Sequence, residues 1–117
     1  MDMRDLRKEL QAVEYSVPGM QPRTVSRFYA SNTMSDLIAH ASPDTLLATA
    51  LNNSQLVRVA ELMDVPGICL VGGAQPSADL LSRAGEAGTT ILVSPLPFDD
   101  AVNVLRRSLG LPEGSAT

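Results

Sequence analysis

The hydrophobic residues of this chain fall into short continuous runs, separated by segments with helical spacing. Three runs lie at Thr45–Leu51, Ile68–Val71 and Thr89–Val93, and none alternates apolar with polar residues. Runs of this kind, bounded by turn residues, are typical of strands that are buried on both faces of a sheet. They predict three strands that follow one another at intervals of about 22 residues.

The segments between and after these runs place apolar residues three and four positions apart, which predicts amphipathic helices. Gln55–Met63 is the clearest example, with Leu56, Val59, Ala60 and Met63 on one face. Two further helices are predicted: Ala78–Ala87, capped by Ser77 and closed by Gly88, and Phe98–Leu109, closed by Gly110.

The region before Thr45 shows shorter and weaker patterns. The spacing of Leu6, Leu10 and Val13 predicts that a helix begins the chain. Thr33, with Asp36 three residues later, forms a capping-box pattern that opens a second helix. The elements predicted here are a helix over Asp2–Glu14, a short strand over Tyr15–Val17, a strand over Thr24–Ala30 and a helix over Met34–Ala41.

Buried strands that alternate with helices define an α/β fold, because each helix returns the chain to the start of the next parallel strand. We expect a three-layer α/β/α arrangement with a mostly parallel sheet of four to five strands and right-handed crossovers. Residues 1–110 form a single domain in this interpretation, with a leading amphipathic helix over 1–14 and a flexible tail over 111–117.

Composition narrows the classes of function. The 117 residues are 44% hydrophobic and 19% charged, which suits one domain with a packed core. The net charge of -4 argues against nucleic acid and against an anionic membrane surface as the main partner. The single Cys excludes an internal disulfide and a Cys-based zinc site, and the single His leaves no His pair for a metal ion. Without a signal peptide or an apolar run of about 20 residues, we expect a soluble, cytoplasmic protein.

Candidate binding residues follow the predicted strands, because ligands of open α/β sheets bind beyond the carboxyl ends of the strands. The pair Gly72-Gly73 precedes the helix that Ser77 caps, so a phosphate could approach the backbone closely and meet free N–H groups. The alternative is a tight strand-to-helix turn without a ligand. The residues predicted to bind a ligand are Ser31, Asn32, Asn52, Asn53, Gly72, Gly73, Ser77 and Ser94.

The remaining reactive side chains offer no catalytic pair. Cys69 lies within an apolar run and is expected in the core, and His40 is expected to cap a helix end or face solvent. Arg23 and Arg27 could reach a phosphate or a partner's carboxylate, or they could simply face solvent at a sheet edge. We therefore predict no catalytic residue, no metal site and no cofactor.

Several motifs, taken in order, resemble the DRTGG domain family over about residues 15–110. The similar segments are YASNTMSDLIAHA, the strand and glycine pair in GICLVGGAQPS, the last strand and helix in AGTTILVSPLPFDDAV, and the leading amphipathic helix. Two positions depart from the family's pattern. Asn52-Asn53 stand where many members have an acidic-basic pair, and Val71 precedes the glycine pair in place of a Thr.

The resemblance implies a regulatory or dimerising module. DRTGG domains occur joined to phosphate acetyltransferases and to pyrophosphatases with CBS domains, and stand-alone versions occur near iron-only hydrogenase and NADH-dehydrogenase-like genes. Some are labelled serine kinases, but this chain has no G-x-x-x-x-G-K-[ST] phosphate loop, so we expect no kinase activity.

These observations favour a non-catalytic, homodimeric regulatory module that binds an adenine-nucleotide-type ligand at the carboxyl ends of the strands. The alternative is a protein–protein adaptor without a small-molecule ligand, associated with a redox, hydrogenase or metabolic partner enzyme. An enzyme that relies on backbone amides is a third hypothesis. It would lack the side chains that supply the factor of about 10²–10⁴ typical of acid–base catalysis.

Overall fold

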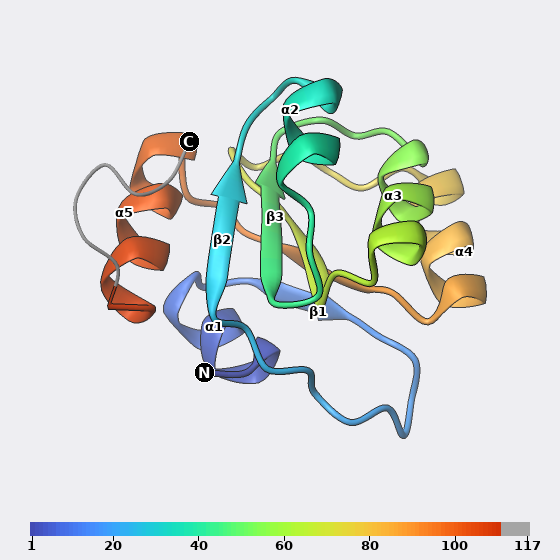
Figure 1. Ribbon diagram of the computed structural model, residues 1–117, viewed down its shortest axis with the longest axis horizontal. Coiled ribbons are helices and arrows are strands. Elements are labelled where there is room, and N and C mark those ends of the chain that lie inside the picture. Colours follow the sequence, from blue (N-terminus) through green and yellow to red (C-terminus); the bar gives the residue numbers. More distant parts are fainter. Residues whose placement is uncertain (111–117) are drawn as a thin grey trace.

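A five-stranded sheet in the order β1-β5-β4-β3-β2 organises residues 1–110, the part of the chain that this computed structural model describes (Figure 1). Strands β2 to β5 run parallel, and β1 pairs with β5 in the antiparallel direction. The α/β class is therefore confirmed, and the five-stranded sheet is mixed, with one antiparallel pair beside four parallel strands. The strands are β1 (Val13–Tyr15), β2 (Arg27–Ala30), β3 (Thr45–Thr49), β4 (Gly67–Leu70) and β5 (Thr90–Val93).

Helices cover both faces of this sheet. The first face carries α2, α3 and α4, because successive right-handed crossovers in one direction place their helices on the same side. The opposite face carries α1 and α5. The helices are α1 (Met3–Glu9), α2 (Met34–His40), α3 (Gln55–Met63), α4 (Ala78–Ala87) and α5 (Phe98–Ser108).

Aliphatic side chains fill the space on both sides of the sheet. Along β3, Leu46 joins the core beneath α1 and α5, whereas Leu47 joins the core beneath α2, α3 and α4. Both side chains are fully buried, and burial of a leucine contributes about 1.5–3 kcal/mol to stability. β3 shows no polar alternation because neither of its faces meets solvent.

The N-terminal segment differs from the predicted helix over Asp2–Glu14. α1 is only seven residues long, Gln11 takes a left-handed conformation with a φ of 55°, and the chain then enters β1. Val13, which the helical spacing placed on a buried face, lies in β1 and is 57% exposed. The strand predicted over Tyr15–Val17 begins two residues too late. Pairing with the distant strand β5 outweighs the local helical pattern here.

Helix capping in this region also differs from the prediction. Thr33 makes no side-chain cap bond, and Asp36 accepts a hydrogen bond from the Ser31 hydroxyl at 3.4 Å. The capping box lies at α1, where the carboxylates of Asp2 and Asp5 each accept from the other's N–H at 3.0 and 3.1 Å. The sequence pattern missed this box because the usual motif carries Glu or Gln at the third position.

The remaining predicted elements are present, with ends that differ by at most three residues. α3 and α4 begin and end at the predicted residues. Gly67, predicted in a turn, is the first residue of β4 and allows α1 to approach the sheet. A Cβ atom there would collide with the Met3 side chain and lie 2.9 Å from the Thr90 carbonyl oxygen. The tail predicted over 111–117 lies outside the described residues.

Candidate functional site

The carboxyl ends of β2, β3, β4 and β5 meet at one edge of the sheet, drawn at the top of Figure 1. We call this region the carboxyl edge. It consists of the loops at 31–33, 50–54, 72–77 and 94–97, which contain all of the residues predicted to bind a ligand. Hydrogen bonds link these loops to one another, and several of the predicted side chains make those bonds.

The β4–α4 loop leaves its backbone open at Gly72 and Gly73. Each has a φ of +74°, a left-handed conformation that favours glycine, and within residues 1–110 no atom beyond the adjacent residues lies within 4 Å of a Cβ built at either position. Their N–H groups are occupied, since Gly72 donates to the Leu96 carbonyl at 2.7 Å and Gly73 to the Ser94 carbonyl at 3.4 Å. The turn is thus accessible to a ligand while its N–H groups hold the β5–α5 loop.

Asn52 joins the β3–α3 loop to the β4–α4 loop. Its Nδ2 donates to the Gln75 carbonyl, and its Oδ1 accepts from the Ser77 N–H at 2.9 Å. Asn53 acts within its own loop, where its Oδ1 accepts from the Gln55 N–H at 2.8 Å. Both amides, predicted to contact a ligand, make structural hydrogen bonds in this arrangement.

Asn32 and Ser31 shape the loop after β2. Asn32 Oδ1 accepts from the Ala50 N–H at 2.8 Å and from the Thr49 hydroxyl at 3.4 Å. Ser31 Oγ accepts from the Thr33 N–H at 3.1 Å. Asn32 therefore ties the β2–α2 loop to the end of β3.

Ser94 is fully buried at the end of β5. Its hydroxyl donates to the Leu10 carbonyl at 2.7 Å and accepts from the Leu96 N–H at 3.2 Å. These bonds attach the β5–α5 loop to the end of α1. The Ser94 side chain has no exposed surface, so it acts on the carboxyl edge by holding the β5–α5 loop in place.

The first turn of α4 presents backbone donors at this edge. Ser77 caps the helix as predicted, because its Oγ accepts from the Leu80 N–H at 3.1 Å. The N–H groups of Ala78 and Asp79 have no acceptor within residues 1–110. They lie at the positive end of the helix dipole, where anions are favoured.

A carboxylate shares this turn with the free N–H groups. The Ser54 hydroxyl, by hydrogen bonding, and then the Arg83 guanidinium hold the pKa of Asp79 below its ordinary value. The side chain of Asp79 is therefore charged at neutral pH. Arg83 Nε lies 3.3 Å from Asp79 Oδ1, which offsets the negative charge beside the helix end.

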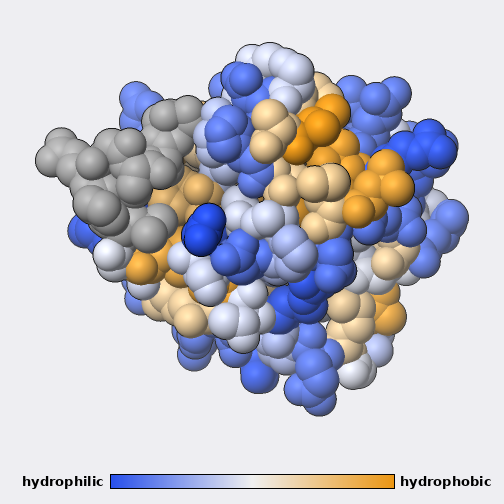
Figure 2. Space-filling view, in the orientation of Figure 1, coloured by the Kyte–Doolittle hydropathy of each residue, from blue (hydrophilic) through white to orange (hydrophobic). Residues whose placement is uncertain are grey.

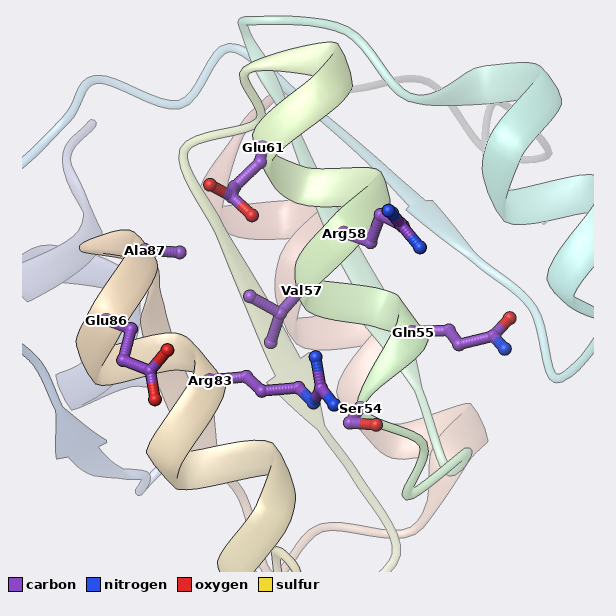
Figure 3. Close-up of a pocket in the computed structure, with 8 residues that line it drawn as sticks. All are labelled: Ser54, Gln55, Val57, Arg58, Glu61, Arg83, Glu86 and Ala87. Atoms are coloured by element: carbon purple, nitrogen blue, oxygen red, sulfur yellow. The ribbon is translucent and has the colours of Figure 1, made fainter.

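A groove of about 500 Å³ runs between α3 and α4, starting next to the carboxyl edge (Figure 3). Arg83 extends toward Ser54 at one end of the groove, and Glu61 and Glu86 lie at the other. These charged residues have no distinctive signature in the sequence, because polar residues on the outer side of a predicted helix are equally expected of a solvated face. The lining residues are Ser54, Gln55, Val57, Arg58, Glu61, Arg83, Glu86 and Ala87.

The two arginines considered as phosphate ligands, Arg23 and Arg27, instead pair with carboxylates of the same chain. Arg23 Nη1 donates to Asp64 Oδ1 at 3.0 Å, and its Nη2 donates to the carbonyl oxygens of Asp64 and Pro43 at 2.9 and 3.2 Å. Arg27 Nε lies 3.6 Å from Asp44 Oδ2. Arg23 thus ties the long β1–β2 connection to the C-terminal end of α3. This contact lies near the amino ends of the parallel strands, away from the carboxyl edge.

The remaining reactive residues serve the structure. Cys69 is fully buried, and burial raises the pKa of its thiol to about 12, so it is protonated and unreactive. His40 stacks on Tyr29 with ring centroids 3.8 Å apart, and its Nδ1–H donates to the Asp36 carbonyl at 3.0 Å. No cluster of three or more His, Cys, Asp or Glu side chains suited to a metal ion occurs within residues 1–110. Within that range, no helix combines the length and the apolar character needed to cross a membrane.

Together these features define a small α/β domain whose parallel strands end in a hydrogen-bonded, loop-rich edge. Among solved structures, the chain is similar to the crystal structure of the CBS and DRTGG domains of the regulatory region of Clostridium perfringens pyrophosphatase, complexed with the activator diadenosine tetraphosphate. The TM-score is 0.71 at 14% sequence identity, over 92% of this chain and 46% of that chain.

The likeness is one of fold, and the chain spans less than half the length of that structure. No family model and no curated protein matches the sequence. The fold of this chain is therefore similar to part of a regulatory region that contains CBS and DRTGG domains.

Proposed function

We propose that this chain is a non-catalytic regulatory domain that acts as a homodimer and binds an adenine-nucleotide-type ligand at the carboxyl edge. The observation that carries the proposal is the β4–α4 loop. Its open backbone at Gly72 and Gly73 leads directly to the free N–H groups of Ala78 and Asp79. Such groups at a helix N-terminus bind phosphate oxygens.

The fold similarity supports the choice of ligand class. The solved structure that this chain resembles contains a regulatory region together with diadenosine tetraphosphate. In the proposal, the phosphates lie against the first turn of α4 and the rest of the nucleotide extends over the neighbouring loops. The side chains of Asn32, Asn52 and Ser94 act by holding these loops in place.

The hydrogen bonds of the carboxyl edge suggest how a bound ligand acts on the rest of the domain. A ligand that orders the β4–α4 loop also orders the β5–α5 loop, because Gly72 and Gly73 donate to Leu96 and Ser94. Ser94 in turn holds the end of α1 through the Leu10 carbonyl. The proposed output is a change in the stability and geometry of the domain, without turnover.

A thermal-unfolding screen tests the proposal. The purified chain is heated with ATP, ADP, AMP, NAD, NADH, diadenosine tetraphosphate or acetyl-CoA. A ligand present at about 100 times its Kd adds about 2.7 kcal/mol to the free energy of unfolding, which raises the Tm by several degrees in a domain of this size. A flat response across the whole panel contradicts the nucleotide proposal and favours the adaptor.

A matched pair of variants at Ser77 locates the binding site. Asp and Asn are both as good as Ser at the N-cap, so Ser77→Asp and Ser77→Asn preserve the start of α4. Ser77→Asp adds a negative charge beside the proposed phosphate position and is expected to abolish the ligand-induced shift. Ser77→Asn adds no charge and is expected to keep it. Equal binding by both variants would place the ligand elsewhere.

A further inference from the structure

The outer surface of α3 combines exposed hydrophobic and charged side chains. Leu62 is 77% exposed, and Ile38 on the neighbouring helix α2 is 48% exposed. Figure 2 shows hydrophobic residues gathered over α2 and α3, with hydrophilic residues around them. An apolar strip with a polar rim is typical of a surface that contacts another protein.

Charged residues beside this strip lie in two rows. Arg58 on α3 and Arg83 on α4 lie nearer the carboxyl edge, and Glu61 and Glu86 follow about one turn further along the same helices (Figure 3). Arg83 is paired with Asp79. The other three make no ion pair within the described part of the chain.

The order of these rows makes the surface complementary to itself. Consider a second copy turned by 180° about an axis that lies in the interface and is perpendicular to α3. This rotation reverses the order of the rows, so that each arginine row faces the glutamate row of the other copy. An axis parallel to α3 would instead bring like charges together, which is destabilising.

We propose that this surface, formed by α3 and α4 with Leu62 at its border, contacts a second copy of the chain. The proposal rests on the homodimer of the proposed function and assigns a surface to it. Arg58 of each copy faces Glu61 of the other, and the exposed side chain of Leu62 is buried against the apolar strip over α2 and α3. Charge complementarity selects a second copy, since one surface supplies both halves of the contact.

The edge strand β1 is the strongest competing surface. Val13 and Tyr15 are 57% and 41% exposed, and a groove of about 370 Å³ separates β1 from α4. However, a symmetric pair of β1 strands centred on Glu14 would place two carboxylates opposite each other, which destabilises a sheet. Glu14 also lies 3.8 Å from Arg7 of its own chain. The charges therefore favour the surface of α3 and α4.

Sedimentation analysis of the full chain tests this assignment. Leu62→Glu, Arg58→Glu and Glu61→Arg are each expected to weaken the dimer about tenfold or more, because each acts twice across the two-fold axis. The double variant Arg58→Glu with Glu61→Arg exchanges the charges and is expected to restore dissociation to within about threefold of the original chain. A different partner protein would not produce this recovery.

Two control variants change exposed residues on other surfaces. Arg4→Glu on α1 and Val13→Glu on β1 are expected to leave the dimer unchanged. Loss of the dimer on Val13→Glu alone would assign the contact to β1 and overturn the inference. Persistence of the dimer in both Leu62→Glu and Arg58→Glu would overturn it too, while leaving the homodimer itself intact.

Two further outcomes test the arrangement of the two copies and the existence of the dimer. A double variant that stays as weak as the single variants contradicts the antiparallel arrangement. A chain that remains monomeric up to about 0.5 mM, a concentration at which even a weak dimer would form, overturns both this inference and the homodimer of the proposed function. Nucleotide binding in the thermal screen would be unaffected by that result.

Discussion

Ser94 illustrates how one hydroxyl group can determine the local structure of the carboxyl edge. Its side chain is fully buried, and it donates to the Leu10 carbonyl across 84 positions of sequence. A buried hydroxyl requires a hydrogen-bond partner, and here the partner is the carbonyl group of Leu10, the residue that caps the C-terminus of α1. In the sequence, a small polar residue after a strand looks the same whether its side chain faces a ligand or another loop.

A second single residue, Asp44, is expected to make folding sensitive to acid. The Ser42 hydroxyl donates to Asp44 Oδ1 at 2.6 Å, and this bond, followed by the nearby Arg27 charge, holds the pKa of Asp44 below its ordinary value of 3.8. The unfolded chain therefore binds this proton more readily than the folded chain. The stabilising contribution of Asp44 is complete above the unfolded pKa and is lost as the pH falls through the lower folded pKa.

Carbon NMR titration of the Asp44 carboxyl group measures this effect. We expect a midpoint below 3.8 in the folded chain and a rise toward that value in Ser42→Ala. Ser16→Ala removes an exposed hydroxyl from a different region and should leave the midpoint unchanged. An unchanged midpoint in Ser42→Ala would contradict the assigned cause.

Among the elements, α3 and α4 were predicted to the residue, because the signals that define them are local. Apolar spacing marks their buried faces, Ser77 caps α4, and Gly88 ends it in a left-handed conformation. β1 carries no comparable signal, since its three residues form a strand only through pairing with β5. The predicted helix over Asp2–Glu14 was too long for the same reason.

The hydrogen bonds that Asn52 makes between two loops give a second prediction. Asn52→Ala removes both hydrogen bonds that join the β3–α3 loop to the β4–α4 loop. We expect a loss of about 1 kcal/mol in the free energy of unfolding, together with faster hydrogen exchange in residues 72–77. Both are measured on the chain without ligand.

Gln55→Ala is the matched control, because it removes a neighbouring exposed amide from α3 and introduces a better helix former. Its stability should be equal or slightly greater. If Asn52→Ala and Gln55→Ala showed the same stability and the same exchange, Asn52 would not be joining the loops as described.

At the scale of the whole molecule, the order of the strands sets the distribution of stability. β3 and β4 lie inside the sheet with strands on both sides, and all of their residues are buried. β1 is an edge strand of three residues, two of which are exposed. Local unfolding is therefore expected to be more frequent at β1 than in the middle of the sheet.

Hydrogen exchange followed by mass spectrometry tests this order. We expect the slowest exchange in peptides that cover β3 and β4, and the fastest strand exchange in β1, because local opening of an edge strand disrupts few buried contacts. A specific nucleotide bound at the carboxyl edge should slow exchange most strongly in residues 72–77. Protection of β1 equal to that of β4 would contradict the description of β1 as a marginal edge.

The order of residues along the chain is enough to predict the α/β class, the alternation of buried strands with helices, and the glycine turn before α4, because periodicity and capping are properties of neighbouring residues. It also located the loops of the carboxyl edge. The folded arrangement was needed to show that β1 pairs antiparallel with β5, that Asn32, Asn52 and Ser94 hold loops together, and that the charges of α3 and α4 form one surface. These features depend on groups that are far apart in the chain, and their partners are known only once the sheet has formed.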